Sequence, residues 1–177
     1  MAKAILLTGE PGSGKTTMIR QILARLHSPA YGFFTEELRE FGVRKGFRLV
    51  TLDGQEAILA NVDFDGPPRV GKYGVDVSVL DRLAVESIRS AIAQKTLLVI
   101  DEIGPMEMLS QKFCQAVLLA MESQTPILGT IVKRKTSFTD KIKSLPGVEV
   151  IEIKRGTFDT TEKLALDLLM QLSGFAS

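Results

Sequence analysis

Apolar residues along the chain follow two patterns, short continuous runs and longer stretches with helical spacing. The runs at residues 4–8 and 96–100 are almost wholly apolar, as in strands that are buried on both faces of a parallel sheet. Across residues 78–93, apolar side chains recur at three- and four-residue intervals, which indicates an amphipathic helix. The same criteria predict further helices at 17–26, 110–121, 138–144 and 161–172, and further strands at 30–38, 47–52, 56–62, 126–132 and 148–153.

Strands and helices alternate except between residues 30 and 62, where three predicted strands follow one another. Residues 41–46 are predicted to form the first turn of this segment, and Asp53-Gly54 marks a tight hairpin at the second. The pattern therefore predicts an α/β fold with three layers, a mainly parallel sheet and an antiparallel β-meander insertion. The length of 177 residues and the hydrophobic content of 45% suit a single domain over residues 1–177.

Charge and cysteine content limit the cellular setting and the partners. The 22 basic and 21 acidic residues nearly cancel, so the composition indicates neither nucleic acid nor a membrane as an obligatory partner. The single cysteine, Cys114, cannot form an internal disulfide, and no stretch resembles a membrane span or a signal peptide. We therefore expect a cytoplasmic protein. As a separate expectation, a monomer is favoured over an oligomer.

A glycine-rich segment between the first predicted strand and the first predicted helix carries the strongest chemical signal. It reads Gly-Glu-Pro-Gly-Ser-Gly-Lys-Thr over residues 9–16, the spacing of a phosphate-binding loop (P-loop). Its backbone N–H groups and the following helix dipole would surround an anion. Lys15 would contact the β- and γ-phosphate oxygens, and Thr16 would ligate Mg²⁺. The residues predicted to bind the nucleotide here are Gly9, Glu10, Pro11, Gly12, Ser13, Gly14, Lys15, Thr16 and Thr17.

Two adjacent carboxylates follow the buried strand at 96–100. Open parallel sheets bind ligands at the carboxyl ends of their strands, so Asp101 and Glu102 are expected to emerge beside the P-loop. Asp101 fits a partner of Mg²⁺ that accepts hydrogen bonds from a coordinated water and from Thr16, which makes these two the predicted metal-site residues. Glu102 would orient the attacking water or accept its proton, so Glu102 and Lys15 are the predicted catalytic residues. The alternative is that the acidic pair only ends a strand in solvent.

Five segments together resemble a known family. They are the loop at 9–16, Gly-Phe-Phe-Thr-Glu-Glu at 32–37, Gly-Phe-Arg at 46–48, Lys-Tyr-Gly-Val at 72–75 and Asp-Glu-Ile-Gly-Pro-Met-Glu at 101–107. The P-loop alone identifies only a superfamily, whereas the 32–37 and 101–107 motifs in this order are much more specific. With them the chain resembles, over essentially its whole length, the thermophilic nucleoside-triphosphatase family, which includes the human cancer-related nucleoside-triphosphatase.

This resemblance implies an activity and assigns residues to it. The implied protein is a compact P-loop α/β domain that hydrolyses ATP, GTP and other nucleoside triphosphates with Mg²⁺, slowly and with little base preference. The family pattern places residues 9–16 on the phosphates, Asp101 on the metal and Glu102 on the water. Gly104, within the 101–107 motif, is added to the predicted nucleotide-binding residues. Members of the family vary at the position of Pro105, so this residue does not weaken the resemblance.

Other charged residues have two interpretations each. Phosphoryl transfer needs positive charge beyond the loop lysine, and Arg48, Lys72 and Arg134 are the candidates to supply it. Each of them also fits an exposed loop cation. Glu36 and Glu37 leave a strand edge near the expected phosphate site, where one of them could bind metal-bound water or both could be solvated.

Three functions are compatible with this chemistry. The favoured one is a nucleoside-triphosphate hydrolase, because the adjacent acidic pair would direct a water at the γ-phosphate. The alternative is a nucleotide or small-molecule kinase, in which an acceptor hydroxyl replaces the water. A third is a nucleotide-dependent switch or accessory subunit that contacts RNA or another protein. The absence of an Asn-Lys-x-Asp motif disfavours a guanine-specific switch, and the near-neutral charge disfavours constitutive RNA binding.

Overall fold

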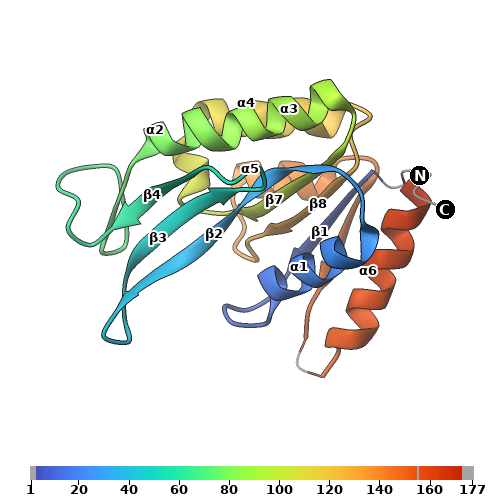
Figure 1. Ribbon diagram of the computed structural model, residues 1–177, viewed down its shortest axis with the longest axis horizontal. Coiled ribbons are helices and arrows are strands. Elements are labelled where there is room, and N and C mark those ends of the chain that lie inside the picture. Colours follow the sequence, from blue (N-terminus) through green and yellow to red (C-terminus); the bar gives the residue numbers. More distant parts are fainter. Residues whose placement is uncertain (1–2, 155, 173–177) are drawn as a thin grey trace.

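The computed structural model describes residues 3–154 and 156–172, and the strands of these segments belong to one nine-stranded sheet (Figure 1). The strands are β1 (Ala4–Thr8), β2 (Ala30–Glu40), β3 (Val43–Thr51), β4 (Glu56–Asn61), β5 (Arg69–Val70), β6 (Tyr73–Val75), β7 (Leu97–Ile103), β8 (Ile127–Ile131) and β9 (Val148–Glu152). Their order across the sheet is β5-β6-β4-β3-β2-β7-β8-β1-β9.

The sheet has a parallel part and an antiparallel part. β1 pairs in parallel with β8 and β9, and β7 pairs in parallel with β2 and β8. From β2 outward the pairing is antiparallel through β3, β4, β6 and β5. The predicted α/β fold with a parallel core and an antiparallel meander is therefore confirmed.

Helices cover both faces of the sheet and complete the three layers (Figure 1). On one face lie α1 (Lys15–Leu26) and α6 (Phe158–Leu172). On the other lie α2 (Val77–Val79), the π-helical turn η1 (Leu80–Ala84), α3 (Val85–Gln94), the 3₁₀ turn η2 (Glu107–Leu109), α4 (Gln111–Glu122) and α5 (Ser137–Ser144). No helix in the described part of the chain has the length and apolarity needed to cross a membrane.

The apolar run of β7 shows why the sheet is covered on both sides. Leu98 and Ile100 pack into the core under α3 and α4, whereas Leu97 and Val99 pack into the core under α1 and α6. All four side chains are fully buried. Because successive strand residues point to opposite faces, a continuous apolar run is stable only between two helical layers.

The long hairpin of β2 and β3 differs most from the sequence-based expectation. Its turn consists of Phe41 and Gly42 alone, both with positive φ, whereas residues 41–46 were expected to form the turn. The strand was missed because residues 43–46 lack alternating apolar side chains. β5 and β6 were not expected either, since strands this short leave no periodic pattern. Helix α1 begins at Lys15 and α6 at Phe158, a few residues earlier than predicted.

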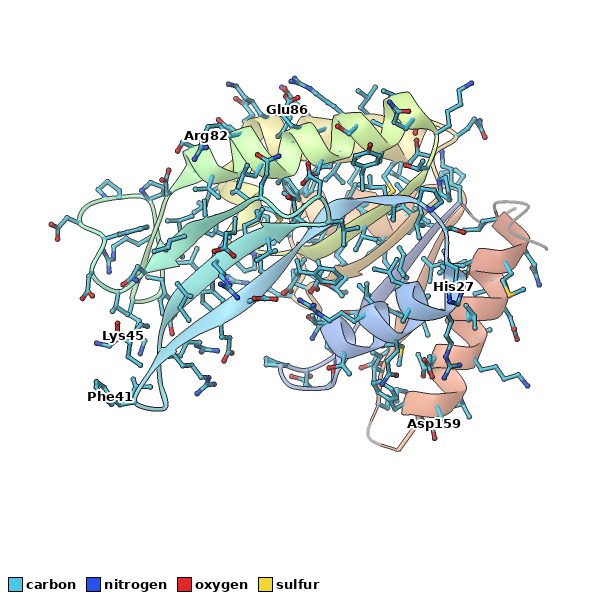
Figure 2. The ribbon with its side chains drawn as sticks, viewed as in Figure 1. His27, Phe41, Lys45, Arg82, Glu86 and Asp159 are labelled. Carbon is cyan, nitrogen blue, oxygen red and sulfur yellow. The ribbon has the colours of Figure 1, made fainter. Side chains whose placement is uncertain are left out.

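The outer half of this hairpin projects beyond the parallel part of the sheet. β2 pairs with β7 only as far as Phe34, opposite Asp101, and then continues with β3 alone to Glu40. Figure 2 shows Phe41 and Lys45 at the tip, well away from the helices. The hairpin thus extends past the carboxyl end of β7, where the predicted site residues emerge.

Candidate active site

The P-loop joins β1 to α1 and has the backbone that its glycines permit. Gly12 and Gly14 have φ values of 77° and 93°, in the left-handed region that other residues avoid. The packing also favours glycine at position 14, because a Cβ there would lie only 2.9 Å from the ring of Phe158. The amino group of Lys15 folds back over the loop and donates to the carbonyl oxygens of Gly9 and Glu10, each at 3.1 Å.

Asp101 is held by hydroxyl groups from two different elements. Thr16 at the start of α1 donates from Oγ1 to Oδ2 at 2.7 Å, and Thr130 of β8 donates from Oγ1 to Oδ1 at 2.7 Å. Asp101 is only 3% exposed, and this burial raises the pKa of its carboxyl group. The two hydroxyl donors and the charge of Lys15 act in the opposite direction. Both oxygens of the carboxylate are therefore fixed in direction.

The Thr16 and Asp101 side chains offer a set of oxygen donors that fits Mg²⁺. Hard oxygen ligands suit this ion, which is commonly bound through one or two protein groups while water and phosphate oxygens fill its other positions. Among the described residues, no group of three or more His, Cys, Asp or Glu side chains could hold a metal by itself. The arrangement therefore suits a metal that arrives with a phosphate ligand, not a site made of protein groups alone.

Glu102 and Glu107 approach each other around Gly104. A Cβ on Gly104 would lie 3.2 Å from Oε1 of Glu102 and 3.1 Å from Oε2 of Glu107. Burial raises the pKa of Glu102, and the nearby charge of Lys15 opposes this. Gly104 therefore makes room for two carboxyl groups. It was predicted to bind the nucleotide, but it is not among the described residues that line the cavity next to the P-loop, Asp101 and Glu102.

A cavity of about 370 Å³ brings most of the predicted residues together. It opens between the P-loop, the end of β7 and the outer half of the β2–β3 hairpin. The loop and α1 contribute Pro11, Gly12, Gly14, Lys15, Thr16 and Thr17 to its wall, β7 contributes Asp101 and Glu102, and the hairpin contributes Thr35, Glu37 and Phe47. We refer to it below as the phosphate cavity.

A second cavity, of about 570 Å³, adjoins the other side of the P-loop. Glu10 and Ser13 line it together with Phe158 and the residues at the end of β9. Lys133 binds two of its acidic residues, with Nζ 3.0 Å from the carboxylate of Glu10 and 2.9 Å from that of Glu152. The P-loop therefore faces cavities on two sides, and Pro11 and Gly12 contribute to both.

Comparison with known proteins assigns the chain to a protein family. The family model described as NTPase matches residues 4–165. The chain belongs to this NTPase family. It is 45% identical over 165 residues to nucleoside-triphosphatase THEP1 of Thermotoga petrophila, covering 93% of this chain and 92% of the relative. It is 37% identical over 172 residues to the THEP1 protein of Methanocaldococcus jannaschii, covering 95% and 96%. The resemblance found in the sequence motifs is thus confirmed.

Solved structures of the NTPase family share the fold. The crystal structure of THEP1 from the hyperthermophile Aquifex aeolicus aligns with a TM-score of 0.83 at 36% identity, over 94% of this chain and 98% of that one. The solution structure of a human cancer-related nucleoside triphosphatase aligns with a TM-score of 0.80 at 34% identity, over 98% of both chains. The described residues therefore have the fold of the family.

The candidate cations named from the sequence do not reach the phosphate cavity. Arg48 donates to Glu36 at 2.9 Å and contacts Glu56 at 3.3 Å, whereas Lys72 lies 5.5 Å from the ring centre of Tyr73. Neither these two nor Arg134 is among the described residues of the cavity wall. Glu36 and Glu37 were each expected either to belong to the site or to face solvent. Glu37 lines the cavity, whereas Glu36 pairs with arginines on the opposite face of the hairpin.

Thr130 and Glu107 are polar groups of this region that sequence reasoning missed. Thr130 lies in a strand whose other members are apolar or glycine, and a threonine in that setting is also a common strand residue. Glu107 belongs to the 101–107 motif, but the sequence pattern alone assigns it no role. Glu107 is 5% exposed, and burial together with the negative charge of Glu102 raises its pKa to about 8.

The raised pKa of Glu107 predicts a pH-dependent stability. Between its ordinary value of 4.5 and about 8 the folded protein keeps the proton and the unfolded chain has lost it, so this group lowers stability as pH rises. Glu107→Gln removes this contribution. We expect the stability of the variant relative to wild type to rise by up to about 2–3 kcal/mol between pH 5 and pH 7, measured by denaturant unfolding. Parallel pH profiles of the two proteins would show that Glu107 is ionised in the folded state.

Proposed function

We propose that this protein hydrolyses nucleoside 5'-triphosphates, ATP and GTP among them, to the diphosphate and phosphate in a Mg²⁺-dependent reaction with little base preference. The curated relatives are named nucleoside-triphosphatases and match the chain over most of its length. The observation that carries the proposal is the position of Glu102, whose side chain lines the same cavity as Lys15 and Thr16. A carboxylate there can act on a water beside the terminal phosphate.

The described residues divide the work of the reaction among them. P-loop N–H groups bind the phosphate chain. Lys15 gives up its hydrogen bonds to the carbonyl oxygens of Gly9 and Glu10 and donates instead to β- and γ-phosphate oxygens. Thr16 and Asp101 would hold the metal, which when bound supplies positive charge to the same oxygens. Thr130 keeps the Asp101 carboxylate in its orientation.

Glu102 governs the chemical step. The oxygen of a water molecule forms a bond to the γ-phosphorus, and the bond from that phosphorus to the β–γ bridging oxygen breaks, with its electron pair remaining on the diphosphate. The Glu102 carboxylate orients this water and accepts its proton. Burial raises the pKa of Glu102, which makes the carboxylate a stronger base than one in water.

Phosphate release with and without acceptors separates this proposal from the kinase alternative. We expect the purified protein with Mg²⁺ to release phosphate from ATP, GTP, CTP and UTP at rates within about 10-fold of one another and without any acceptor. A panel of nucleosides and nucleoside monophosphates should leave these rates unchanged. Consumption of ATP only in the presence of an acceptor would indicate a kinase, and activity only with a protein or RNA partner would indicate a switch.

A further inference from the structure

The outer half of the β2–β3 hairpin carries two clusters of glutamate and arginine, one on each face. Glu36 and Glu37 are neighbours in β2, so their side chains point to opposite faces. Glu36 binds Arg20 of α1 at 2.6 Å and Arg48 of β3 at 2.8 Å, on the face toward α1. Glu37 binds Arg39 at 2.6 Å and Arg44 at 2.7 Å, on the face toward the phosphate cavity.

The phosphate cavity has too little positive charge for its expected ligand. Among the described residues of its wall, Lys15 is the only cation, against the carboxyl groups of Glu37, Asp101 and Glu102. A triphosphate remains negatively charged when a metal is bound, and its hydrolysis is accelerated by cations that contact the terminal oxygens. A side-chain cation close to the wall would supply the missing charge.

Glu37 lines the cavity and forms ion pairs with two cations, Arg39 and Arg44. Arg44 and Arg39 both lower the pKa of its carboxyl group, which keeps it ionised. Glu37, Arg39 and Arg44 together carry one net positive charge. The Glu37 carboxylate alone would repel a phosphate, but here it holds two arginines beside the cavity. The side chains of Arg44 and Glu37 are 43% and 39% exposed, which leaves the pair room to separate.

Arg44 is the arginine placed to move into the cavity. Its guanidinium lies 5.3 Å from the ring centre of Phe47, which lines the cavity, and its Nε donates to the hydroxyl of the buried Tyr73 at 2.9 Å. Phe47 and Glu37 thus place Arg44 against the cavity wall, whereas its bond to Tyr73 of β6, on the side of β3 away from β7, would break as Arg44 moves in. Arg39 is instead bound through Nη1 to the carbonyl of Gly42 at the tip, at 2.9 Å.

We propose that Arg44 is the second cation of the active site, held by Glu37 until the terminal phosphate of a bound triphosphate takes its place. The inference rests on the proposed hydrolysis. The guanidinium exchanges one anionic partner for another, and Glu37 remains paired with Arg39, so the movement leaves no charge unpaired. In the chemical step Arg44 binds the oxygens of the γ-phosphate. The bonds that form and break, and the proton that passes to Glu102, are those described above.

The hairpin provides a matched control for testing this proposal. Arg44→Ala and Arg48→Ala each remove an arginine that β3 pairs with a glutamate of β2, but on opposite faces. We expect Arg44→Ala to lower kcat by about 10²-fold and Arg48→Ala to leave kcat within about 3-fold of wild type. Added guanidinium ion should restore part of the activity of Arg44→Ala, which also shows that this variant is folded.

Binding measurements separate a catalytic contact from a structural one. Arg44→Ala should bind ADP with Mg²⁺ as wild type does, but should lose affinity for ADP with Mg²⁺ and aluminium fluoride, which imitates the phosphoryl group in transfer. Arg44→Lys, which keeps the charge but loses the two-pronged geometry, should stay impaired. Wild-type kcat in Arg44→Ala, or an equal loss in Arg48→Ala, would overturn the inference while the hydrolase remained. Absence of phosphate release from the wild-type protein would overturn both.

Discussion

Replacement of Lys15 by alanine is expected to abolish detectable hydrolysis, with a loss of at least about 10³-fold in phosphate release from ATP and GTP. In the structure its amino group caps the P-loop carbonyls of Gly9 and Glu10 and lines the phosphate cavity. Nucleotide binding should weaken as well, because the cation at the β- and γ-phosphate oxygens serves the bound substrate and the transition state alike. Steady-state phosphate release over a range of ATP concentrations gives both quantities.

Lys112→Ala is the control for this substitution. Lys112 lies on α4 in the opposite helical layer, where its amino group is 3.8 Å from the carboxylate of Asp81. Loss of that contact, in which the lysine is exposed, should leave turnover within about 2-fold of wild type. If Lys15→Ala hydrolysed ATP at the wild-type rate, the cavity lined by Lys15 would not be the site of hydrolysis.

Replacement of Glu102 by glutamine is expected to preserve ATP affinity and to reduce hydrolysis by at least ~10²-fold, the usual scale for the loss of a general base. The amide has the shape of the carboxyl group but cannot accept the proton of the attacking water. Burial already raises the pKa of Glu102, so the substitution removes a comparatively strong base. Single-turnover phosphate release measures the chemical step, and equilibrium binding of a non-hydrolysable ATP analogue measures affinity.

Glu36→Gln is the control for the Glu102 variant, because Glu36 is bound by Arg20 and Arg48 on the face of the hairpin away from the phosphate cavity. Its kcat should remain within about 3-fold of wild type. The opposite pattern in Glu102→Gln, with reduced affinity and an unchanged kcat, would make Glu102 a metal ligand or a structural residue.

The parts of the site that the sequence predicts are those determined by local pattern. The P-loop has fixed spacing between a strand and a helix, and Asp101 and Glu102 directly follow a buried run, so their meeting at one sheet edge follows from the parallel topology. The three-layer fold was predictable for the same reason, since buried strands alternate with amphipathic helices. Contact between Thr16 and Asp101, which are 85 residues apart, was the expectation that the structure reproduces most directly.

The parts that could not be predicted depend on pairing between distant strands. Thr130 reaches Asp101 only because β8 lies beside β7. The two-residue period of a strand shows that Glu36 and Glu37 point in opposite directions, but not which of them faces the P-loop. Arg44 was hidden because residues 41–46 were expected to form a turn. The sequence therefore offered Arg48, Lys72 and Arg134 as the cation, and none of them is among the described residues of the cavity wall.

Isothermal titration calorimetry with Mg²⁺ and a non-hydrolysable triphosphate tests the central claim most directly, namely that the P-loop with Lys15, Thr16 and Asp101 binds a polyphosphate chain. Binding is measured here apart from hydrolysis. The account predicts a saturable heat for the wild-type protein and at least about 10-fold weaker affinity for Lys15→Ala. Absence of any binding heat, with every triphosphate tried and with Mg²⁺ present, would contradict it.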